Sequence, residues 1–183
     1  MIAYLRDHLA SRNLQLGRYN HVSIDDTNEV ATFPLWNLSG QMVGFQQYRP
    51  WGSKSQNNNP REGKYFTYIT GGHIGVWGVD TLHYNQHQVF VCEGIFDACQ
   101  LHNFDLPAIA VLGNNPLHIV PWLKALGRKI IAIPDDDDAG RNLGKLAHET
   151  LSVAPFLKGV HRGSRDLGRL KPEQVEQLLA PFL

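Results

Sequence analysis

Apolar and polar residues alternate over short runs in the first part of the chain, a pattern that favours strands over long helices. One helix is predicted at the start, over residues 2–13, where apolar residues recur at helical spacing. Strands rich in β-branched and aromatic residues are predicted next, at 30–36, 42–48 and 65–69. A hairpin turn at 39–41 joins the first two, and the polar, basic stretch 51–64 is expected to be a mobile loop. We interpret residues 1–86 as a small α+β N-terminal subdomain.

The pattern changes near residue 87, where nearly continuous apolar runs begin to alternate with amphipathic segments. Apolar runs of this kind are typical of strands buried on both faces, and the helices between them imply a mostly parallel sheet. Strands are predicted within 87–94, 108–114, 129–134 and 153–160, and helices within 95–102, 115–127, 140–151 and 171–183. Residues 87–183 are therefore predicted to form an α/β domain whose parallel sheet is flanked by helices.

Composition narrows the protein class. Hydrophobic residues make up 43% of the 183 residues and charged residues 19%, which excludes a disordered or fibrous chain. No apolar run approaches the roughly 20 residues that span a bilayer, and the charged start favours neither a signal peptide nor an anchor. We expect a cytoplasmic protein with no membrane partner. Cys92 and Cys99 lack zinc-ligand spacing and are predicted to be buried free thiols.

The net charge is zero, with 17 basic and 17 acidic residues, but the charges are unevenly distributed. Residues 89–143 carry four basic and seven acidic groups, whereas residues 1–88 carry seven and six and residues 144–183 carry six and four. The middle of the chain is therefore acidic, between mildly basic flanks that suit a nucleic-acid backbone.

Acidic residues follow two of the predicted parallel strands. Glu93 ends the first strand, and Asp135 to Asp138 follow the third. Parallel strands end at one edge of the sheet, so these carboxylates converge if the two strands are neighbours. Alternation along extended backbone pairs Asp135 with Asp137, and Asp138 is predicted to cap the next helix. Such hard oxygen ligands select Mg²⁺ or Mn²⁺; the alternative is a solvated acidic turn.

Two motifs carry a resemblance to a known family. E-G-I-F-D-A at 93–98 and D-D-D-D-A-G-R at 135–141 resemble the two signatures of the Toprim domain, which topoisomerases, bacterial-type primases and several nucleases share. Upstream, SGQMVGFQQYR, KYFTYITGG and VWGVD resemble the segments that precede Toprim in bacterial and bacteriophage primase polymerase cores. The resemblance covers roughly residues 30–170, and it includes neither a zinc module nor a helicase phosphate loop.

The resemblance implies roles for individual residues. By this resemblance, Glu93 is expected to act as a general acid or base or as a metal-associated carboxylate. Asp135 and Asp137 are the expected metal ligands. Asp97 and Asp166 are expected to be accessory acids. Lys64, Arg141 and Arg49 become candidates for binding phosphates of nucleotide or nucleic acid. Arg49 stands one position after Tyr48, which occupies the place of the family's usual arginine, and His73 stands where a lysine is usual.

The leading functional hypothesis is a primase-like nucleotidyltransferase core that makes RNA primers on single-stranded DNA. It implies nucleoside triphosphates, Mg²⁺ or Mn²⁺, and a helicase or template-recognition protein acting in trans, in a bacterial or phage-infected cell. Two alternatives stay open: a metal-dependent Toprim nuclease, and a non-catalytic module that binds nucleic acid or a replication protein. Trp51 is the aromatic residue expected to be exposed for stacking on bases.

Overall fold

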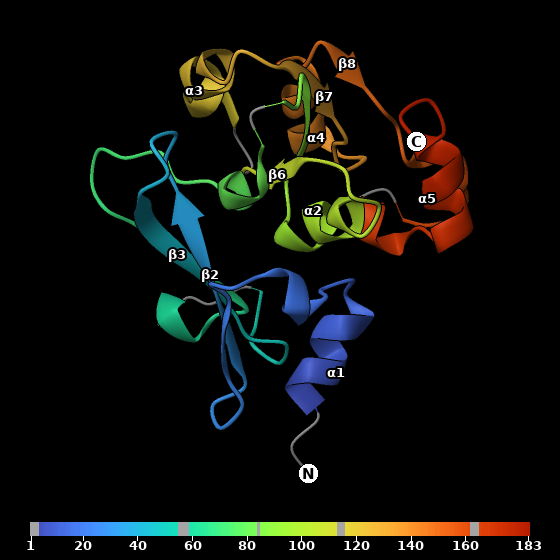
Figure 1. The fold of residues 1–183 in the computed structure, drawn as a ribbon. Coiled ribbons are helices and arrows are strands. Elements are labelled where there is room, and N and C mark those ends of the chain that lie inside the picture. The colour runs from blue at the N-terminus through green and yellow to red at the C-terminus, as the bar shows by residue number, and fades with distance from the viewer. Residues whose placement is uncertain (1–3, 55–58, 84, 113–115, 162–164) are drawn as a thin grey trace. The chain divides into compact units, whose positions relative to one another are not determined.

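Two structural units make up the chain, and each contains its own four-stranded sheet (Figure 1). The computed structural model describes residues 4–54, 59–83, 85–112, 116–161 and 165–183. The units are Met1–Asp80 and Thr81–Leu183. The boundary between them thus lies after Asp80, whereas the sequence pattern placed it after residue 86.

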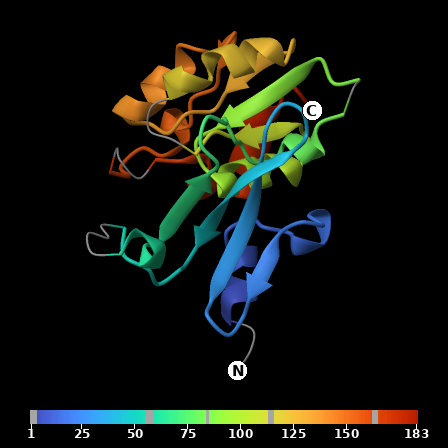
Figure 2. The ribbon, with the colours of Figure 1, turned by 90° about the vertical axis from the view of Figure 1, so that its left-hand side faces the viewer.

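The first unit contains an antiparallel sheet in which the strands follow one another in chain order (Figure 2). Its strands are β1 (Ser23–Asp25), β2 (Val30–Trp36), β3 (Met42–Tyr48) and β4 (Tyr65–Ile69). Helix α1 (Tyr4–Ser11) precedes them, and short 3-10 turns lie at Leu16–Arg18, Pro60–Glu62 and Val79–Thr81. Strand β1 is not among the strands predicted from the sequence, because three residues are too few for a recognisable alternation.

The β2–β3 hairpin forms where the sequence predicted it. The Gln41 backbone N–H donates to the Asn37 side chain at 2.9 Å, and Gly40 adopts a positive φ of 72°, which suits a residue without Cβ. Phe33, Leu35 and Tyr48 on these strands are completely buried and form the core of the unit.

The second unit contains a parallel sheet of four short strands. They are β5 (Gln88–Cys92), β6 (Ala108–Ala110), β7 (Lys129–Ala132) and β8 (Glu149–Thr150), in the order β6-β5-β7-β8. The central pair, β5 and β7, is buried almost throughout. This confirms the predicted α/β class with a mostly parallel sheet after a smaller α+β unit.

Helices cover both faces of this sheet, as right-handed crossovers require for the observed strand order. Helix α2 (Ile95–His102) packs on β5 and β6, and α5 (Pro172–Leu179) lies on the same side, where Phe182 packs edge-on against Phe90 of β5 (Figure 1). The connection from β6 to β7 contains a 3-10 turn at Pro116–Ile119 followed by α3 (Val120–Ala125). The connection from β7 to β8 contains α4 (Asp138–Gly144). Further 3-10 turns lie at Ala154–Phe156 and Leu167–Arg169.

Two predicted elements near the end of the sheet are wrong. The helix predicted for 140–151 ends at Gly144, and the chain then pairs with β7 as β8, with the His148 N–H donating to the Ile130 carbonyl. The strand predicted for 153–160 is a 3-10 turn instead, because Pro155 cannot donate a ladder hydrogen bond. Pairing with the open edge of β7 outweighs the local helical pattern.

Within the described ranges, no helix has both the length and the apolar character needed to cross a membrane.

Candidate active site

Two carboxylates from distant motifs meet at the carboxyl edge of the parallel sheet. Strands β5 and β7 are hydrogen-bonded neighbours, with Val91 opposite Ala132, so the condition that the sequence left open is met. The Asp135 backbone N–H donates to Glu93 Oε1 at 3.3 Å. This contact joins the loop after β7 to the end of β5.

The acidic loop after β7 turns tightly before it enters α4. The Asp137 N–H donates to the Asp135 carbonyl at 2.8 Å, and Asp137 Oδ1 accepts from the Gly140 N–H at 2.8 Å. Asp137 is therefore the N-cap, and the prediction that Asp138 caps the helix is wrong. Because of the tight turn, helix α4 begins one residue earlier than predicted. Asp138 therefore lies in the first turn of α4, where it pairs with Arg141.

Gly140 permits this turn because a side chain does not fit there. A Cβ at position 140 would lie 2.0 Å from the Asp135 carbonyl oxygen, far inside van der Waals contact. The Ala-Gly of the second acidic motif thus has a steric role: its glycine lets the helix backbone approach the acidic loop.

Burial and mutual repulsion change the proton affinity of the two facing acids. Burial, followed by the charges of Asp135 and Asp137, raises the pKa of Glu93 to about 7. Burial, followed by the charges of Asp166 and Asp137, raises the pKa of Asp135 to about 7 as well. Asp166, which the sequence offered only as a further acid, therefore lies within electrostatic reach of Asp135.

The central aspartate of the loop, Asp136, has a partner of its own in Arg165. Asp136 Oδ2 accepts from Arg165 Nη1 at 3.0 Å, and the Asp136 N–H donates to the Arg165 carbonyl at 2.9 Å. Arg165 also donates through Nε to the Val160 carbonyl at 2.7 Å. Arg165 thus ties the acidic loop to the segment before α5, and the sequence offered no signal for this role.

Asp97 is held by the same C-terminal segment. Its Oδ1 accepts from the Gly168 N–H at 2.9 Å, so one oxygen positions the turn that follows Asp166. A Cβ at Gly168 would lie 3.3 Å from carboxylate oxygens of both Asp97 and Asp166. The carboxylates of both acids therefore lie next to this glycine. The catalytic role of Asp97 stays a prediction.

The donor set suits a hard divalent cation. Glu93, Asp135 and Asp137 offer only carboxylate oxygens. Burial and then mutual repulsion raise the pKa values of Glu93 and Asp135, and a bound cation would lower them again. Among the described residues, no three acidic, histidine or cysteine side chains are gathered closely enough to enclose an ion. Mg²⁺ fits such an open arrangement, because it typically takes one or two carboxylates and keeps several waters.

A cavity of about 350 Å³ lies beside the acidic loop. Basic and hydroxyl groups face the three aspartates Asp135, Asp136 and Asp137 across it. Its other lining residues are Pro134, Gly140, Arg141, Gly144, Lys145, Thr150 and Ser152. The sequence predicted Arg141 for phosphate binding but missed Lys145, although the four-residue spacing places both on one face of the chain leaving α4.

The other two predicted basic residues belong to the first unit. Arg49 follows β3 and donates through Nη2 to Gln47 Oε1 at 2.9 Å, which places it on the strand face opposite Tyr48. Its Nη1 is buried with no acceptor in the part of the chain that the structure describes. Lys64 Nζ lies 5.9 Å from the centre of the Tyr48 ring. His73 is an exposed loop residue.

Lys64 belongs to a group of cations and rings that we call the cation–aromatic cluster. Burial and the charges of Lys54 and Arg12 lower the pKa of Lys64, so positive groups gather here. Trp51 is 59% exposed, as predicted, and its ring lies 5.4 Å from Tyr4 and 5.7 Å from His8. The cluster comprises Tyr4, His8, Arg12, Trp51, Lys54 and Lys64. The sequence did not single out Tyr4 and His8 of α1 or Arg12 just after it, because only the fold brings these residues to the loop.

Comparisons with known proteins agree with this architecture. No protein-family profile matches the sequence, and no curated protein matches it either. The RNA polymerase domain of Mycobacterium tuberculosis primase DnaG is similar in structure, with a TM-score of 0.55 and 22% identity over 95% of this chain and 62% of that one. The primase fragment of the bacteriophage T7 primase-helicase has a TM-score of 0.56 and 14% identity over 87% and 65%.

A DnaG primase catalytic domain bound to single-stranded DNA is also similar, with a TM-score of 0.52 and 20% identity over 96% of this chain and 58% of that one. This chain spans less than two thirds of these three primase chains. The fold is that of bacterial and phage primase catalytic cores, which confirms the resemblance drawn from the acidic motifs.

Proposed function

We propose that this protein is a metal-dependent nucleotidyltransferase core that synthesises RNA primers on single-stranded DNA. The observation that carries the proposal is the meeting of Glu93 and Asp135 across β5 and β7, with Asp137 at the start of α4. The primase-core fold supports the same reaction class. Nucleoside triphosphates, Mg²⁺ or Mn²⁺ and single-stranded DNA are the implied ligands.

In this proposal the acidic edge binds the metal ion, and the adjoining cavity binds the phosphates of the nucleotide. One or two of the carboxylates of Asp135, Asp137 and Glu93 would bind a divalent cation directly, and the others would bind the waters that it keeps. The cation would supply positive charge that neutralises the triphosphate and the transferred phosphoryl group. Arg141 and Lys145 line the adjoining cavity, where they would bind phosphate oxygens. Glu93, at the end of β5, would accept a proton at its carboxylate from the attacking hydroxyl.

The remaining contacts fix these groups in place. Arg165 binds the Asp136 carboxylate and would thereby hold the acidic loop in position. Asp97 holds the turn after Asp166 through the Gly168 N–H. Both contacts tie the last part of the chain to the site, and we propose positioning roles for Arg165 and Asp97.

The first unit would bind the template. The cation–aromatic cluster combines positive groups with the exposed Trp51 ring, which suits phosphates and stacked bases of a single strand. A DnaG primase neighbour is bound to single-stranded DNA, and the T7 neighbour comes from a primase-helicase. We infer a helicase or template-recognition protein as a partner in trans.

The test is the Asp137→Asn variant. Asparagine keeps the oxygen that caps α4 but removes the negative charge, so the fold is retained. We expect primer synthesis from labelled ribonucleotides on single-stranded DNA to fall by about 100-fold or more, the scale for loss of one charge-stabilising group. Mn²⁺ binding, followed by the spin-resonance signal of the free ion, should weaken in parallel. Glu173→Gln, in the exposed first turn of α5, is the matched control.

Each alternative has its own outcome. Synthesis and Mn²⁺ binding at wild-type level in Asp137→Asn would refute the metal assignment. Cleavage of labelled DNA by the wild-type protein with Mn²⁺ and no nucleotides would favour the nuclease. DNA binding with neither Mn²⁺ binding nor synthesis would favour the non-catalytic module.

A further inference from the structure

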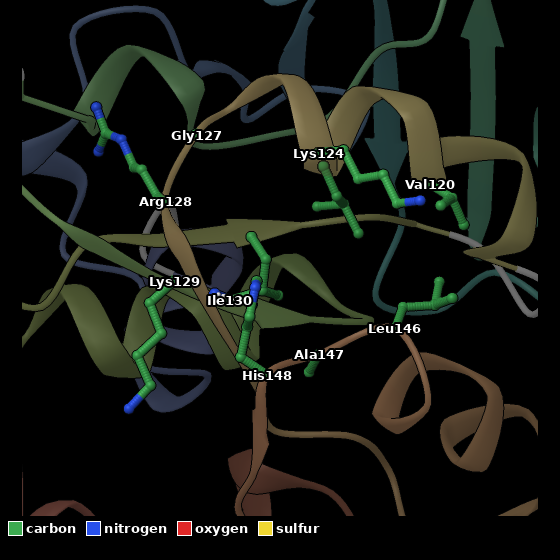
Figure 3. A pocket seen from close by; sticks show the side chains of 10 residues that line it. Val120, Lys124, Gly127, Arg128, Lys129, Ile130, Leu146, Ala147 and His148 are labelled. Carbon is green, nitrogen blue, oxygen red and sulfur yellow. Dashed lines mark hydrogen bonds between the residues drawn. The ribbon is translucent and has the colours of Figure 1, made fainter.

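A second, larger cavity lies in the second unit, at the end of the parallel sheet where strands β7 and β8 begin (Figure 3). The acidic loop lies at the other end of these strands. The cavity has a volume of about 550 Å³, within the usual 300–1,000 Å³ range of small-molecule sites. It is formed by α3, the start of β7 and the segment between α4 and β8. The lining residues are Val120, Leu123, Lys124, Gly127, Arg128, Lys129, Ile130, Leu146, Ala147 and His148.

The lining combines an apolar surface with positive charge. Val120, Leu123, Ile130, Leu146 and Ala147 supply the apolar part, and Leu123 and Ile130 are buried. Lys124, Arg128 and Lys129 supply cations, and none of the lining residues named here is acidic. A ligand that fits must therefore bury an apolar body and carry negative charge.

Two of the three cationic side chains in the cavity already have partners within the protein, and the third, Lys124, is available to a ligand. Lys129 pairs with Glu149 at 2.6 Å, and Arg128 donates to the His83 carbonyl at 2.9 Å. Lys124 is exposed, and no hydrogen bond or ion pair engages its ammonium among the residues that the structure describes. Figure 3 shows its side chain reaching toward Val120, along one side of the cavity.

His148 provides a second available donor. Its Nδ1 accepts from the Ile130 backbone N–H at 2.9 Å, so in the neutral ring the proton lies on Nε2. That hydrogen bond fixes the ring at the edge of the sheet. Nε2–H is then free of the backbone contact and can donate to an anionic oxygen.

We propose that this cavity binds a small organic anion with a flat apolar body and one carboxylate, sulfonate or phosphate group. Lys124, beside Val120, and His148 Nε2–H, beside Ile130, are the donors available to the anionic group, while Leu123, Ile130 and Ala147 would contact the apolar body. An acidic peptide fits less well. The six residues of α3 and the two of β8 are too short for a helix groove or a strand-addition edge.

The cavity is lined by residues at the start of β7 and by residues just after the end of α4, the two elements that flank the acidic loop. Lys129 and Ile130 begin β7, which leads to Asp135, and Leu146 to His148 follow α4, which Asp137 caps. The two cavities described here share no lining residue. The proposal therefore stands independently of the proposed primase activity.

The experiment uses the full chain and the fluorescent anion 1-anilinonaphthalene-8-sulfonate, whose aromatic body and sulfonate match the proposed chemistry. We expect saturable emission from one site per chain and a rise in Tm, because a ligand of the native state stabilises it. Lys124→Glu should weaken binding at least tenfold. Lys158→Glu, at an exposed lysine outside the cavity, should leave it unchanged. The uncharged analogue N-phenyl-1-naphthylamine should bind at least tenfold more weakly.

A second variant tests the cavity itself. Ala147→Phe fills the space with a ring and should abolish probe binding, while far-UV circular dichroism shows whether the fold is retained. Unchanged binding in folded Ala147→Phe, or in Lys124→Glu, would overturn the proposal. So would equal binding of the uncharged analogue, a fall in Tm with the probe, or displacement by a Glu- and Phe-rich peptide but not by naphthalene-1-sulfonate.

Discussion

The Asp135 backbone amide donates a hydrogen bond of 3.3 Å to the Glu93 carboxylate, joining the ends of two neighbouring parallel strands. Partial burial of the Glu93 carboxyl group, followed by the charges of Asp135 and Asp137, raises its pKa to about 7, although the hydrogen bond itself acts in the opposite direction. In metal-free protein the folded state therefore holds a proton that the unfolded state, with the ordinary value of 4.5, has already released.

This difference predicts how stability depends on pH. The contribution of Glu93 to the free energy of unfolding is most favourable below about pH 4.5 and is lost as pH rises through about 7. We expect the Tm of the wild-type protein in EDTA to fall more steeply between pH 5.5 and 8 than that of Glu93→Gln, whose amide keeps the hydrogen-bond acceptor. Equal slopes for the two proteins would contradict the raised pKa; Glu173→Gln should keep the wild-type slope.

Gly140→Ala should destabilise the protein through the backbone of the acidic loop. The added Cβ meets the Asp135 carbonyl oxygen, which cannot rotate away as a side chain does. We expect a loss of about 1–3 kcal/mol in the free energy of unfolding, the range for overpacking. Chemical denaturation measures the loss. Gly144→Ala, in the same helix but with only ordinary contacts at Thr150, should be close to neutral; an equal loss in both would point to the helix, not the clash.

The ion pair between Asp136 and Arg165 should contribute measurably to stability. Both side chains are about three-quarters buried, so solvent screens their interaction less than that of a surface pair. A double-mutant cycle with Asp136→Asn and Arg165→Gln should give a coupling of about 1–2 kcal/mol. The more exposed pair Lys129 and Glu149 should couple by only a few tenths of a kcal/mol. Additive effects at Asp136 and Arg165 would show that the pair does not hold the loop.

Trp51→Ala should weaken binding of single-stranded DNA by about tenfold, because stacking on one aromatic ring stabilises a base by roughly 1–3 kcal/mol. Fluorescence anisotropy of labelled oligothymidylate measures the affinity. Tyr68→Ala is the control: Tyr68 is 50% exposed but lies on the sheet face opposite the Tyr48–Tyr65 pair. Equal losses in both variants, or no loss at Trp51, would exclude the cation–aromatic cluster as the stacking surface.

Elements with a strong local pattern were predictable. The runs that became β2, β3, β5 and β7 are apolar or β-branched over several residues, and each formed as expected. The short β1 and β8 were missed, because their two or three residues form strands only by pairing with a longer neighbour. The turn at Pro116–Ile119 is 3-10 where a continuous helix was predicted, since Pro121 lacks the N–H that a continuous helix would bond to the carbonyl of residue 117.

The acidic edge was partly predictable. That Glu93 and the aspartates follow parallel strands is visible in the sequence, and so is the separation of Asp136 from the pair formed by Asp135 and Asp137. The partner of Asp136, Arg165, was not, because the two residues lie 29 positions apart and nothing local links them. The contact between Asp97 and Gly168 spans 71 positions and was equally hidden.

The sequence by itself determined the fold class, the acids at the strand ends and the exposure of Trp51, because these depend on short-range periodicity and turn chemistry. Tertiary structure decided that β5 and β7 are neighbours, that Asp137 caps α4, and which cations line each cavity. These facts depend on strand order and on contacts between distant segments, which packing of the whole unit selects and no local pattern encodes.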